Sequence, residues 1–358
     1  MSTDSSNTLL KGRARDVYRR NHAKADGRAL RLYGYAPHEG APGEELLASA
    51  TDQSELRRDP LRGTWSLYAP HRQARTFNPS AAADPLAPAG GGAVTEIPFR
   101  DYELAIFDNR FPSLKPGAPA GALTDWAEGP ATGRCEVVVY TSAAEGSLHT
   151  IGQDRRVLLL EALVDRYAAL HAEGAAYVMP FENRGEQVGV TLPHPHGQIY
   201  TFPFVPAPQA AAAVAFAGGY DLTADHRSWG GRFDVASVGD VSAFCPPFAR
   251  FPFETWIMPN RRCPGPWAMN ADEIEALAAL LGDVTRRLDA LFGAAMPYMM
   301  SFQAAPGGTA KDYQFTVQFF PILRDAGRLK FLASVEQHTG VFTVDVVPEA
   351  AAERLRAL

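Results

Sequence analysis

Apolar side chains recur with helical spacing in two long segments of the chain. The first segment covers residues 154–172 and the second covers residues 271–292. In both, the apolar positions fall three or four residues apart, which is the pattern of an amphipathic helix packed on a core. Asn270 stands directly before the second segment and is suited to cap its N-terminus. We therefore predict two amphipathic helices.

Short apolar or alternating runs predict the strands. They cover residues 64–68, 104–107, 136–140, 198–204, 255–258 and 313–320. The run 136–140 is almost wholly apolar, so we expect it to be buried. The mixture of strands and long helices predicts an α+β fold.

The order of these elements indicates an internal duplication. A buried strand precedes each predicted helix, and a similar apolar segment follows it, at residues 177–181 and 298–302. Each segment leads through a glycine-containing turn to a further strand. We predict two halves, each a mostly antiparallel sheet carrying a helix, joined by a polar, Ala/Gly-rich connector at about 206–239.

The two halves differ in one short segment. The first half has His194-Pro195-His196 where the second has Thr316-Val317-Gln318. If the duplication is real, only the first half has kept a nucleophile.

Three regions follow from this division. Residues 1–45 are polar, carry patches of arginine and lack sustained periodicity, so we expect an N-terminal extension that is partly ordered at best. Residues 46–208 form the predicted catalytic half and residues 209–358 the degenerate second half. The Ala/Pro/Gly-rich stretch 80–94 is predicted to be a mobile loop.

Composition excludes several classes of protein. The 358 residues are 46% hydrophobic and 21% charged with a formal net charge of −6, which is typical of a soluble globular protein and argues against a nucleic-acid-coating surface. No apolar run approaches the roughly 18 residues of a membrane span. The polar N-terminus resembles no secretory signal, and three scattered cysteines build neither a disulfide framework nor a Cys-x-x-Cys metal site. We expect a cytoplasmic protein.

The segment around His194 and His196 carries the chemistry. In an extended segment residues two apart share a face, so the two imidazoles are expected to face one space, stiffened by Pro195. Gly197 would let a ligand approach the backbone, and Gln198 would offer an amide on the same face as His196. Upstream, residues 181–191 supply an Asn, an Arg, glycines and a hydroxyl that could line a pyrophosphate.

Imidazole is a good nucleophile toward phosphorus because a pKa of about 6.5 leaves it mostly neutral at pH 7. Attack on an α-phosphate would form a phosphoramidate and divide one displacement into two easier steps. A single histidine is more often structural, however, and His-x-His on a strand is more often a metal pair. The pentapeptide alone leaves these readings open, and the surrounding Asn-Arg-Gly and Gly-Val-Thr elements favour the nucleophile.

From about Arg57 to the C-terminus, the chain resembles the galactose-1-phosphate uridylyltransferases, the transferase branch of the histidine-triad superfamily. Several ordered motifs carry the resemblance: Pro70-His71-Arg72-Gln73-Ala74-Arg75, Phe107-Asp108-Asn109-Arg110-Phe111-Pro112, Phe181-Glu182-Asn183-Arg184-Gly185, His194-Pro195-His196-Gly197-Gln198, Phe251-Pro252-Phe253-Glu254-Thr255, and Lys330-Phe331 with Glu336. The resemblance implies a histidine-triad-like fold made of two duplicated halves.

It also implies roles for particular residues. His196 would carry the uridylyl group in a ping-pong reaction between a UDP-sugar and a sugar 1-phosphate, and Gln198 would bond the phosphoryl oxygens. The implied nucleotide-binding residues are Arg72, Arg75, Asn109, Asn183, Thr191 and His194. Lys330, Phe331 and Glu336 would face the sugar phosphate. Family members are homodimers whose sites borrow residues from the partner subunit, so we expect a homodimer with no nucleic-acid or membrane partner.

The chain departs from the family at its metal sites. The usual Cys-x-x-Cys zinc pair falls on Asp84-Pro85-Leu86-Ala87, and a further zinc histidine falls near Ala144, which leaves only His194. The histidines of the second metal site match Gln303, Thr316 and Gln318. One imidazole does not hold zinc. We predict a protein without zinc, iron or another cofactor.

The chain also departs from the family near the residues implied to face the sugar phosphate. Val335 stands where the family commonly has a tyrosine or a small residue, and a valine cannot hydrogen-bond a sugar hydroxyl. An unusual sugar phosphate is therefore one hypothesis for the acceptor. Two alternatives remain open: a nucleotide-sugar hydrolase or phosphorylase that uses the same histidine, and a non-catalytic nucleotide-binding protein.

Overall fold

A computed structural model describes residues 6–48, 54–74, 84–90, 94–118, 129–307 and 311–358. Its centre is a twelve-stranded sheet in which every neighbouring pair of strands is antiparallel. In spatial order the strands are β1 (Asn7–Leu10), β2 (Val17–Ala23), β3 (Ala29–Gly34), β6 (Leu104–Asp108), β8 (Cys135–Val139), β10 (His196–Phe202), β9 (Tyr177–Arg184), β14 (Tyr298–Gln303), β15 (Thr316–Pro321), β13 (Thr255–Pro259), β12 (Val241–Phe244) and β11 (Asp234–Val238).

Smaller elements surround this sheet. They are a sheet of β4 (Glu55–Arg58), β5 (Trp65–Tyr68) and β7 (Gly129–Pro130), the hairpin β16 (Leu323–Asp325) and β17 (Arg328–Leu329), the helices α2 (Ala207–Ala217), α3 (Leu222–Ser228), α5 (Ser334–Thr339) and α6 (Pro348–Arg356), and the 3₁₀ turns η1 (Pro70–Ala74), η3 (Glu186–Val188) and η4 (Pro266–Ala268).

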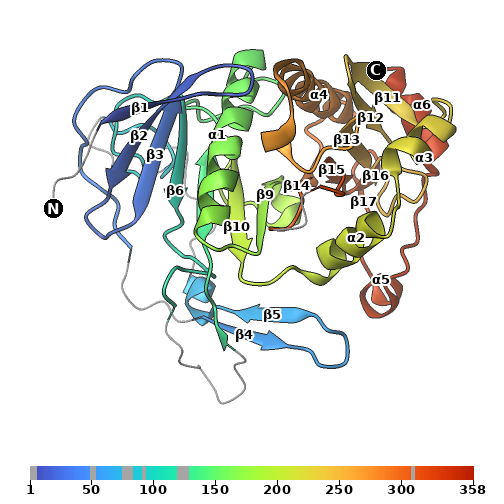
Figure 1. The fold of residues 1–358 in the computed structure, drawn as a ribbon, viewed down its shortest axis with the longest axis horizontal. Coiled ribbons are helices and arrows are strands. Elements are labelled where there is room, and N and C mark those ends of the chain that lie inside the picture. Colours follow the sequence, from blue (N-terminus) through green and yellow to red (C-terminus); the bar gives the residue numbers. More distant parts are fainter. Residues whose placement is uncertain (1–5, 49–53, 75–83, 91–93, 119–128, 308–310) are drawn as a thin grey trace.

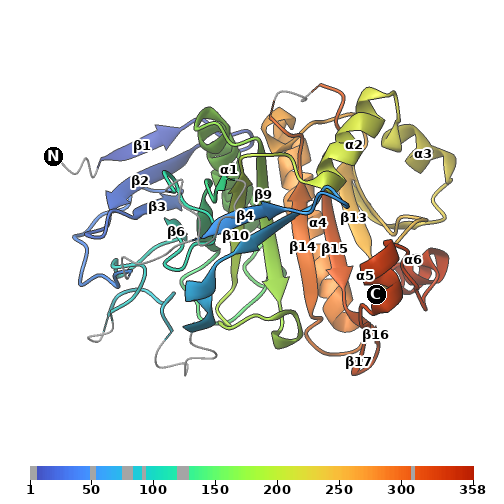
Figure 2. The ribbon, with the colours of Figure 1, turned by 90° about the horizontal axis from the view of Figure 1, so that it is seen from below.

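Two long helices cover one face of the main sheet (Figures 1 and 2). They are α1 (Gln153–Ala172) and α4 (Ala271–Ala290), within two residues of the predicted helices. The predicted cap is confirmed, since Asn270 Oδ1 accepts from Glu273 N at 2.9 Å while Asn270 N donates to the Glu273 carboxylate at 2.8 Å. Their apolar faces share one buried core with the strands beneath them.

The predicted duplication is visible in the strand order. In the first half β8, α1, β9 and β10 follow one another, and in the second half β13, α4, β14 and β15 do so. β9 and β14 are neighbours at the centre of the sheet, and outward from them β10 and β8 correspond to β15 and β13. The two halves therefore form one continuous sheet with a common core.

The connector between the halves is more structured than its Ala/Gly-rich composition predicted. It contains α2, α3 and β11. Phe216 of α2 and Leu222 of α3 pack on Phe244 and Met258 of the second half, on the face of the sheet opposite α4. Alanine is a good helix former, and the apolar surface of the second half gives the alanine-rich segment a face to pack against, so this segment is helical.

The prediction of a loosely ordered N-terminal extension was wrong. Residues 7–34 form β1, β2 and β3, and β3 pairs with β6 to continue the main sheet. Leu30, Leu32 and Tyr33 are fully buried. Polar side chains of these strands have partners on α1, among them Arg19, which forms an ion pair with Asp165 at 2.8 Å. Such distant partners cannot be read from the local sequence.

The face without long helices is covered in two places near β10. Leu86, Ile97 and Phe99 from the segment after residue 83 pack over β3, β6 and β8. The small sheet of β4 and β5 crosses over the other end of β10, as Figure 2 shows. Of the predicted mobile loop, residues 80–83 and 91–93 lie outside the described residues, and the remainder is a loop that packs on the core. In the described part of the chain, no helix is long and apolar enough to cross a membrane.

Candidate active site

His196 is the first residue of β10 and is half-buried. Its Nδ1 lies 2.7 Å from the backbone oxygen of His194. Since a carbonyl oxygen only accepts, Nδ1 must carry the proton in the neutral ring, and the lone pair is therefore on Nε2. This single contact selects the tautomer in which Nε2 is the nucleophilic nitrogen. β10 alternates between its two faces, so Gln198 shares the face of His196, as predicted.

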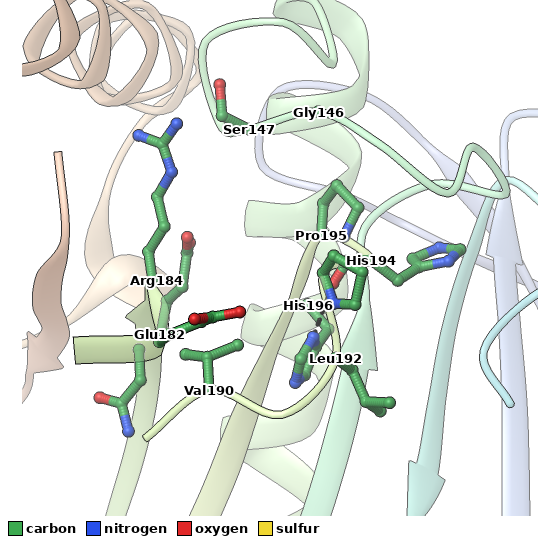
Figure 3. Close-up of a pocket in the computed structure, with 13 residues that line it drawn as sticks. Gly146, Ser147, Glu182, Arg184, Val190, Leu192, His194, Pro195 and His196 are labelled. Atoms are coloured by element: carbon green, nitrogen blue, oxygen red, sulfur yellow. Dashed lines mark hydrogen bonds between the residues drawn. The ribbon is translucent and has the colours of Figure 1, made fainter. Parts of the chain in front are cut away.

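His194 does not share that space. Its imidazole is 1% exposed, and Figure 3 shows it pointing in a different direction from His196. Nδ1 lies 2.7 Å from Asp84 Oδ2, and Nε2 lies 2.7 Å from the backbone oxygen of Thr141. The expected shared face was wrong because residue 194 precedes β10, where strand alternation does not apply. The ring of His194 is thus engaged with the protein and supports the backbone that orients His196.

Asp84 is the partner that sequence reasoning missed in this role. Burial alone would raise the pKa of Asp84, but hydrogen bonds from His194 and from the Leu86 amide lower it below the ordinary value. Both ring nitrogens of His194 face acceptors, so an imidazolium paired with a carboxylate satisfies every contact. A buried aspartate–histidine pair therefore stands where the family resemblance placed a cysteine ligand and a histidine ligand.

A pocket of about 370 Å³ lies beside the His194–His196 segment. Its lining residues are Gly146, Ser147, Glu182, Asn183, Arg184, Gly185, Glu186, Val190, Leu192, Pro193, His194, Pro195 and His196. Asn183 comes from the end of β9, and Thr191 lies in the loop that returns from β9 to β10. That loop turns at Gly185 and Gly189, which have φ values of 99° and 79° that favour glycine. The predicted phosphate-lining segment is therefore folded around the candidate nucleophile.

Glu182 is a buried carboxyl group at this pocket that the sequence did not single out. Tyr298 of β14 donates to it at 2.9 Å, and Tyr140, which follows β8, donates at 3.2 Å. Burial raises the pKa of Glu182 to about 7. Its two tyrosine partners come from different halves of the molecule, so only the assembled sheet brings them together.

The structure requires glycine at position 197 for a different reason from the expected close approach of a ligand. A Cβ at this position would lie 2.3 Å from Tyr140 Oη and 2.8 Å from the backbone oxygen of Phe181. The close approach is therefore that of neighbouring protein groups, and any larger residue would push them away from the strand that carries His196.

Asn109 lies at the end of β6, beside a second pocket of about 660 Å³. Its backbone N donates to the Cys135 oxygen at 2.8 Å, and its side-chain oxygen accepts from Phe111 N at 2.8 Å. Cys135 is paired with Tyr200, which lies four residues after His196 and on the same face of β10. Along the strand this places the Asn109 pocket about 13 Å from His196.

Arg72 is near this pocket as well. Its Nη1 lies 2.8 Å from Ser113 Oγ, 3.1 Å from the Phe111 oxygen and 3.3 Å from Tyr200 Oη. Arg72 is thus partly buried and bonded to three neighbouring groups. Arg75 lies outside the described residues.

Lys330, Phe331 and Glu336 lie in another part of the molecule. They belong to the segment from β17 to α5, at the edge of the second half (Figures 1 and 2). Lys330 Nζ lies 2.9 Å from Glu336 Oε1, and both side chains are buried, whereas Phe331 is 72% exposed. A single chain does not bring these three residues to His196.

The residues matching the second metal site are Gln303, Thr316 and Gln318, and each bonds to neighbouring amide or hydroxyl groups. We call these three residues, together with Ser301, Tyr177 and Gln209, the Gln303 cluster. Gln303 Oε1 accepts from Tyr177 and Gln209, both at 3.0 Å, and Gln303 Nε2 donates to Ser301 at 2.7 Å. Gln318 Nε2 donates to Thr316 Oγ1 at 3.0 Å. The described residues contain no group of three or more His, Cys, Asp or Glu side chains suited to a metal.

Comparisons with known proteins agree with this geometry. The model of the galactose-1-phosphate uridyl transferase N-terminal domain matches residues 47–206, and that of the C-terminal domain matches residues 233–358. The galactose-1-phosphate uridylyltransferase of Thermotoga maritima is 37% identical over 84% of this chain and 98% of its own length. That of Streptomyces lividans is 33% identical over 93% of this chain and 95% of its own.

A solved uridylyltransferase structure has the same fold. It superposes with a TM-score of 0.76 at 28% identity, and the match covers 85% of this chain and 97% of that one. The expected α+β, histidine-triad-like fold is thereby confirmed. The chain belongs to the galactose-1-phosphate uridylyltransferase family, whose substrates are UDP-sugars and sugar 1-phosphates.

Proposed function

We propose that this protein transfers UMP from a UDP-sugar to a sugar 1-phosphate through a covalent intermediate on His196. The observation that carries the proposal is the contact between His196 Nδ1 and the His194 oxygen, which leaves the nucleophilic lone pair on Nε2. The buried Asp84–His194 pair supports it, because it holds the backbone that makes this contact.

In the first half-reaction, His196 Nε2 attacks the α-phosphorus of the UDP-sugar. A P–N bond forms, the bond from the α-phosphorus to the bridging oxygen breaks, and the sugar 1-phosphate leaves with that electron pair. The proton on Nδ1 stays with the imidazole, whose developing positive charge is stabilised by the carbonyl oxygen of His194. Gln198, on the same face, is the amide donor for the phosphoryl oxygens.

In the second half-reaction, a phosphate oxygen of the acceptor attacks the same phosphorus and the P–N bond breaks. His196 is thereby regenerated and a new UDP-sugar is released. Galactose 1-phosphate is the proposed acceptor, since the relatives at 37% and 33% identity are named for it. Exchange with UDP-glucose, followed by product analysis with and without acceptor, distinguishes transfer from hydrolysis and phosphorolysis.

Intact-mass measurement after incubation with UDP-glucose tests the intermediate. We expect the mass of one uridylyl group on wild type and none on His196→Ala. His338→Ala changes an exposed histidine of the second half and serves as the matched control. An unmodified wild type, or an adduct that persists in His196→Ala, contradicts the covalent mechanism.

We further propose that Lys330, Phe331 and Glu336 act in the site of the partner subunit of a homodimer. Their distance from His196 within one chain and the 72% exposure of Phe331 support this. Co-expressing His196→Ala with Lys330→Ala tests it. Each variant alone should be inactive, and random pairing should restore about a quarter of the wild-type activity, because half of the dimers then contain one intact site. Without restoration, the site is not shared.

We also propose that the enzyme works without zinc or iron. The two nitrogens of His194 are bonded to Asp84 and Thr141, and the amides and hydroxyls of the Gln303 cluster bond one another. Neither set fits a transition metal, which prefers thiolate, imidazole and carboxylate ligands. Elemental analysis of the purified protein should find no stoichiometric zinc or iron, and finding either would overturn the proposal.

A further inference from the structure

The pocket at Asn109 has a wall that lies mostly before the residues matched by the family model. Asp26, Gly27 and Arg28, from the turn between β2 and β3, line it together with Ala48. The matching family model begins at residue 47. The turn between the N-terminal strands therefore lines the pocket at Asn109, in addition to the part these strands play in extending the sheet.

Arg28 is the central residue of this wall. Its Nε lies 2.8 Å from Asp26 Oδ2, its Nη1 lies 2.8 Å from Glu96 Oε2 and 3.2 Å from the Asp108 oxygen, and its Nη2 lies 2.6 Å from the Leu46 oxygen. The side chain is only 10% exposed. One guanidinium thus joins the β2–β3 turn, two loops and the end of β6, which is an arrangement that only the arginine fork can make. We call Arg28, Asp26 and Glu96 the clasp.

The clasp holds both chain neighbours of Asn109. On one side, Asp108 has its backbone oxygen on Arg28, and its carboxylate accepts from Ala29 N at 3.0 Å. On the other side, Arg110 forms an ion pair at 3.4 Å with Glu96, which is buried and also bonded to Arg28. The position of Asn109 is therefore set from both sides by contacts that depend on the N-terminal strands.

The clasp also removes negative charge from the pocket. Asp26 is paired with Arg28, Glu96 with both Arg28 and the buried Lys24, and Asp108 with Arg134 at 3.2 Å. Arg110 and Lys115 also line or border the space. A pocket with its carboxylates neutralised in this way suits an anionic ligand, and it opens on the face of the sheet that carries His196.

We propose that Arg28 is a positioning residue for nucleotide recognition, acting through Asp108 and Arg110 on Asn109, and that the turn 26–28 forms the wall beside the nucleoside. The inference rests on the proposed function, since it takes the nucleotide to extend from His196 toward Asn109. It gives the N-terminal strands a role in binding the nucleotide substrate and none in binding the sugar 1-phosphate.

Steady-state kinetics of Arg28→Gln and Arg28→Lys in the full chain test this. Both variants should raise the KM for UDP-glucose and the Kd for UMP about tenfold, with an unchanged KM for galactose 1-phosphate. Lysine keeps the charge and loses the fork, so a wild-type KM in Arg28→Lys would overturn the positioning role. The matched control is Arg19→Gln, which breaks the ion pair with Asp165 on α1, within the same strands and away from the pocket.

If Arg19→Gln raises the KM for UDP-glucose equally, the N-terminal strands act through general stability and the inference fails. Should the Arg28 variants not fold, Ala48→Phe fills the same wall while keeping the Ala48 amide bond to Asp26. It should also raise the KM for UDP-glucose alone, and unchanged kinetics would overturn the inference. Measuring the covalent adduct distinguishes failure of the proposed function from failure of this inference. If wild type forms no adduct, the proposed function is rejected. If wild type forms the adduct and the variants show an unaltered dependence on UDP-glucose concentration, only the inference about Arg28 is rejected.

Discussion

The two halves share one topology and differ in the polar residues on the face opposite the long helices. In the first half, β10 begins at His196, and a buried Asp84–His194 pair holds the segment before it. In the second half, β15 begins at Thr316, and the residues of the Gln303 cluster bond mainly one another. The same sheet-and-helix scaffold therefore carries different polar groups in its two halves, and the first half presents an imidazole whose tautomer is set by a neighbouring carbonyl oxygen.

The largest expected effect tests whether the chemistry is confined to the first half. His196→Ala should lower the rate of UMP transfer about ten-thousand-fold, since the covalent route is lost. Adding Gln318→His to this variant should not restore transfer, because residue 318 lies inside β15 and lacks the carbonyl contact that orients His196. Rates measured with purified proteins decide this, and a restored adduct would show that the halves are equivalent.

The second largest effect is expected from removing the Asp84–His194 pair, which holds the segment before His196. Asp84→Ala leaves a buried, protonatable His194 without its carboxylate, so we expect a loss of about 3 kcal/mol in the free energy of unfolding and slower adduct formation. Urea denaturation measures the first and rapid-quench mass spectrometry the second. Asp59→Ala, at the exposed turn between β4 and β5, is the control and should cost less than about 1 kcal/mol. Equal losses would remove the special role of the pair.

The pH dependence of stability tests the contact between the halves at Glu182, which accepts hydrogen bonds from a tyrosine of each half. The pKa of Glu182 is about 7 in the folded state and about 4.5 for an ordinary glutamate, so between these two pH values the folded state binds a proton that the unfolded state has lost. Stability should therefore fall as the pH rises from about 4.5 to 7, by about 3 kcal/mol in total. Glu182→Gln keeps the shape, lacks the titration and should flatten this slope. A slope unchanged in Glu182→Gln would assign the pH dependence to other groups.

The smallest effect is expected in the second half. The side-chain amide of Gln318 donates to Thr316, two residues away on the same strand, so Gln318→Ala should change the free energy of unfolding by about 1 kcal/mol or less and leave transfer unchanged. The corresponding change on the reactive strand, Gln198→Ala, should slow adduct formation about a hundredfold, because it removes a donor to the phosphoryl group. Similar rates for the two variants would contradict the assigned role of Gln198.

The sequence by itself determined the periodic elements and their repetition. Both long helices, the Asn270 cap and the strands on either side of His196 follow from spacing and local chemistry, because these signals lie within a few residues of one another. The likeness of the two halves and the restriction of the His-Pro-His segment to the first were legible for the same reason. The motif around His196 also led to the correct family.

Only the tertiary structure decided which polar residues meet. The N-terminal strands looked like a solvated tail because their partners, such as Asp165 for Arg19 and Glu96 for Arg28, are more than 60 residues away in the chain. The partnership of Asp84 with His194 spans 110 residues, and Glu182 is held by tyrosines from both halves. Burial gives such charged pairs their energetic weight, and burial is a property of the assembled sheet.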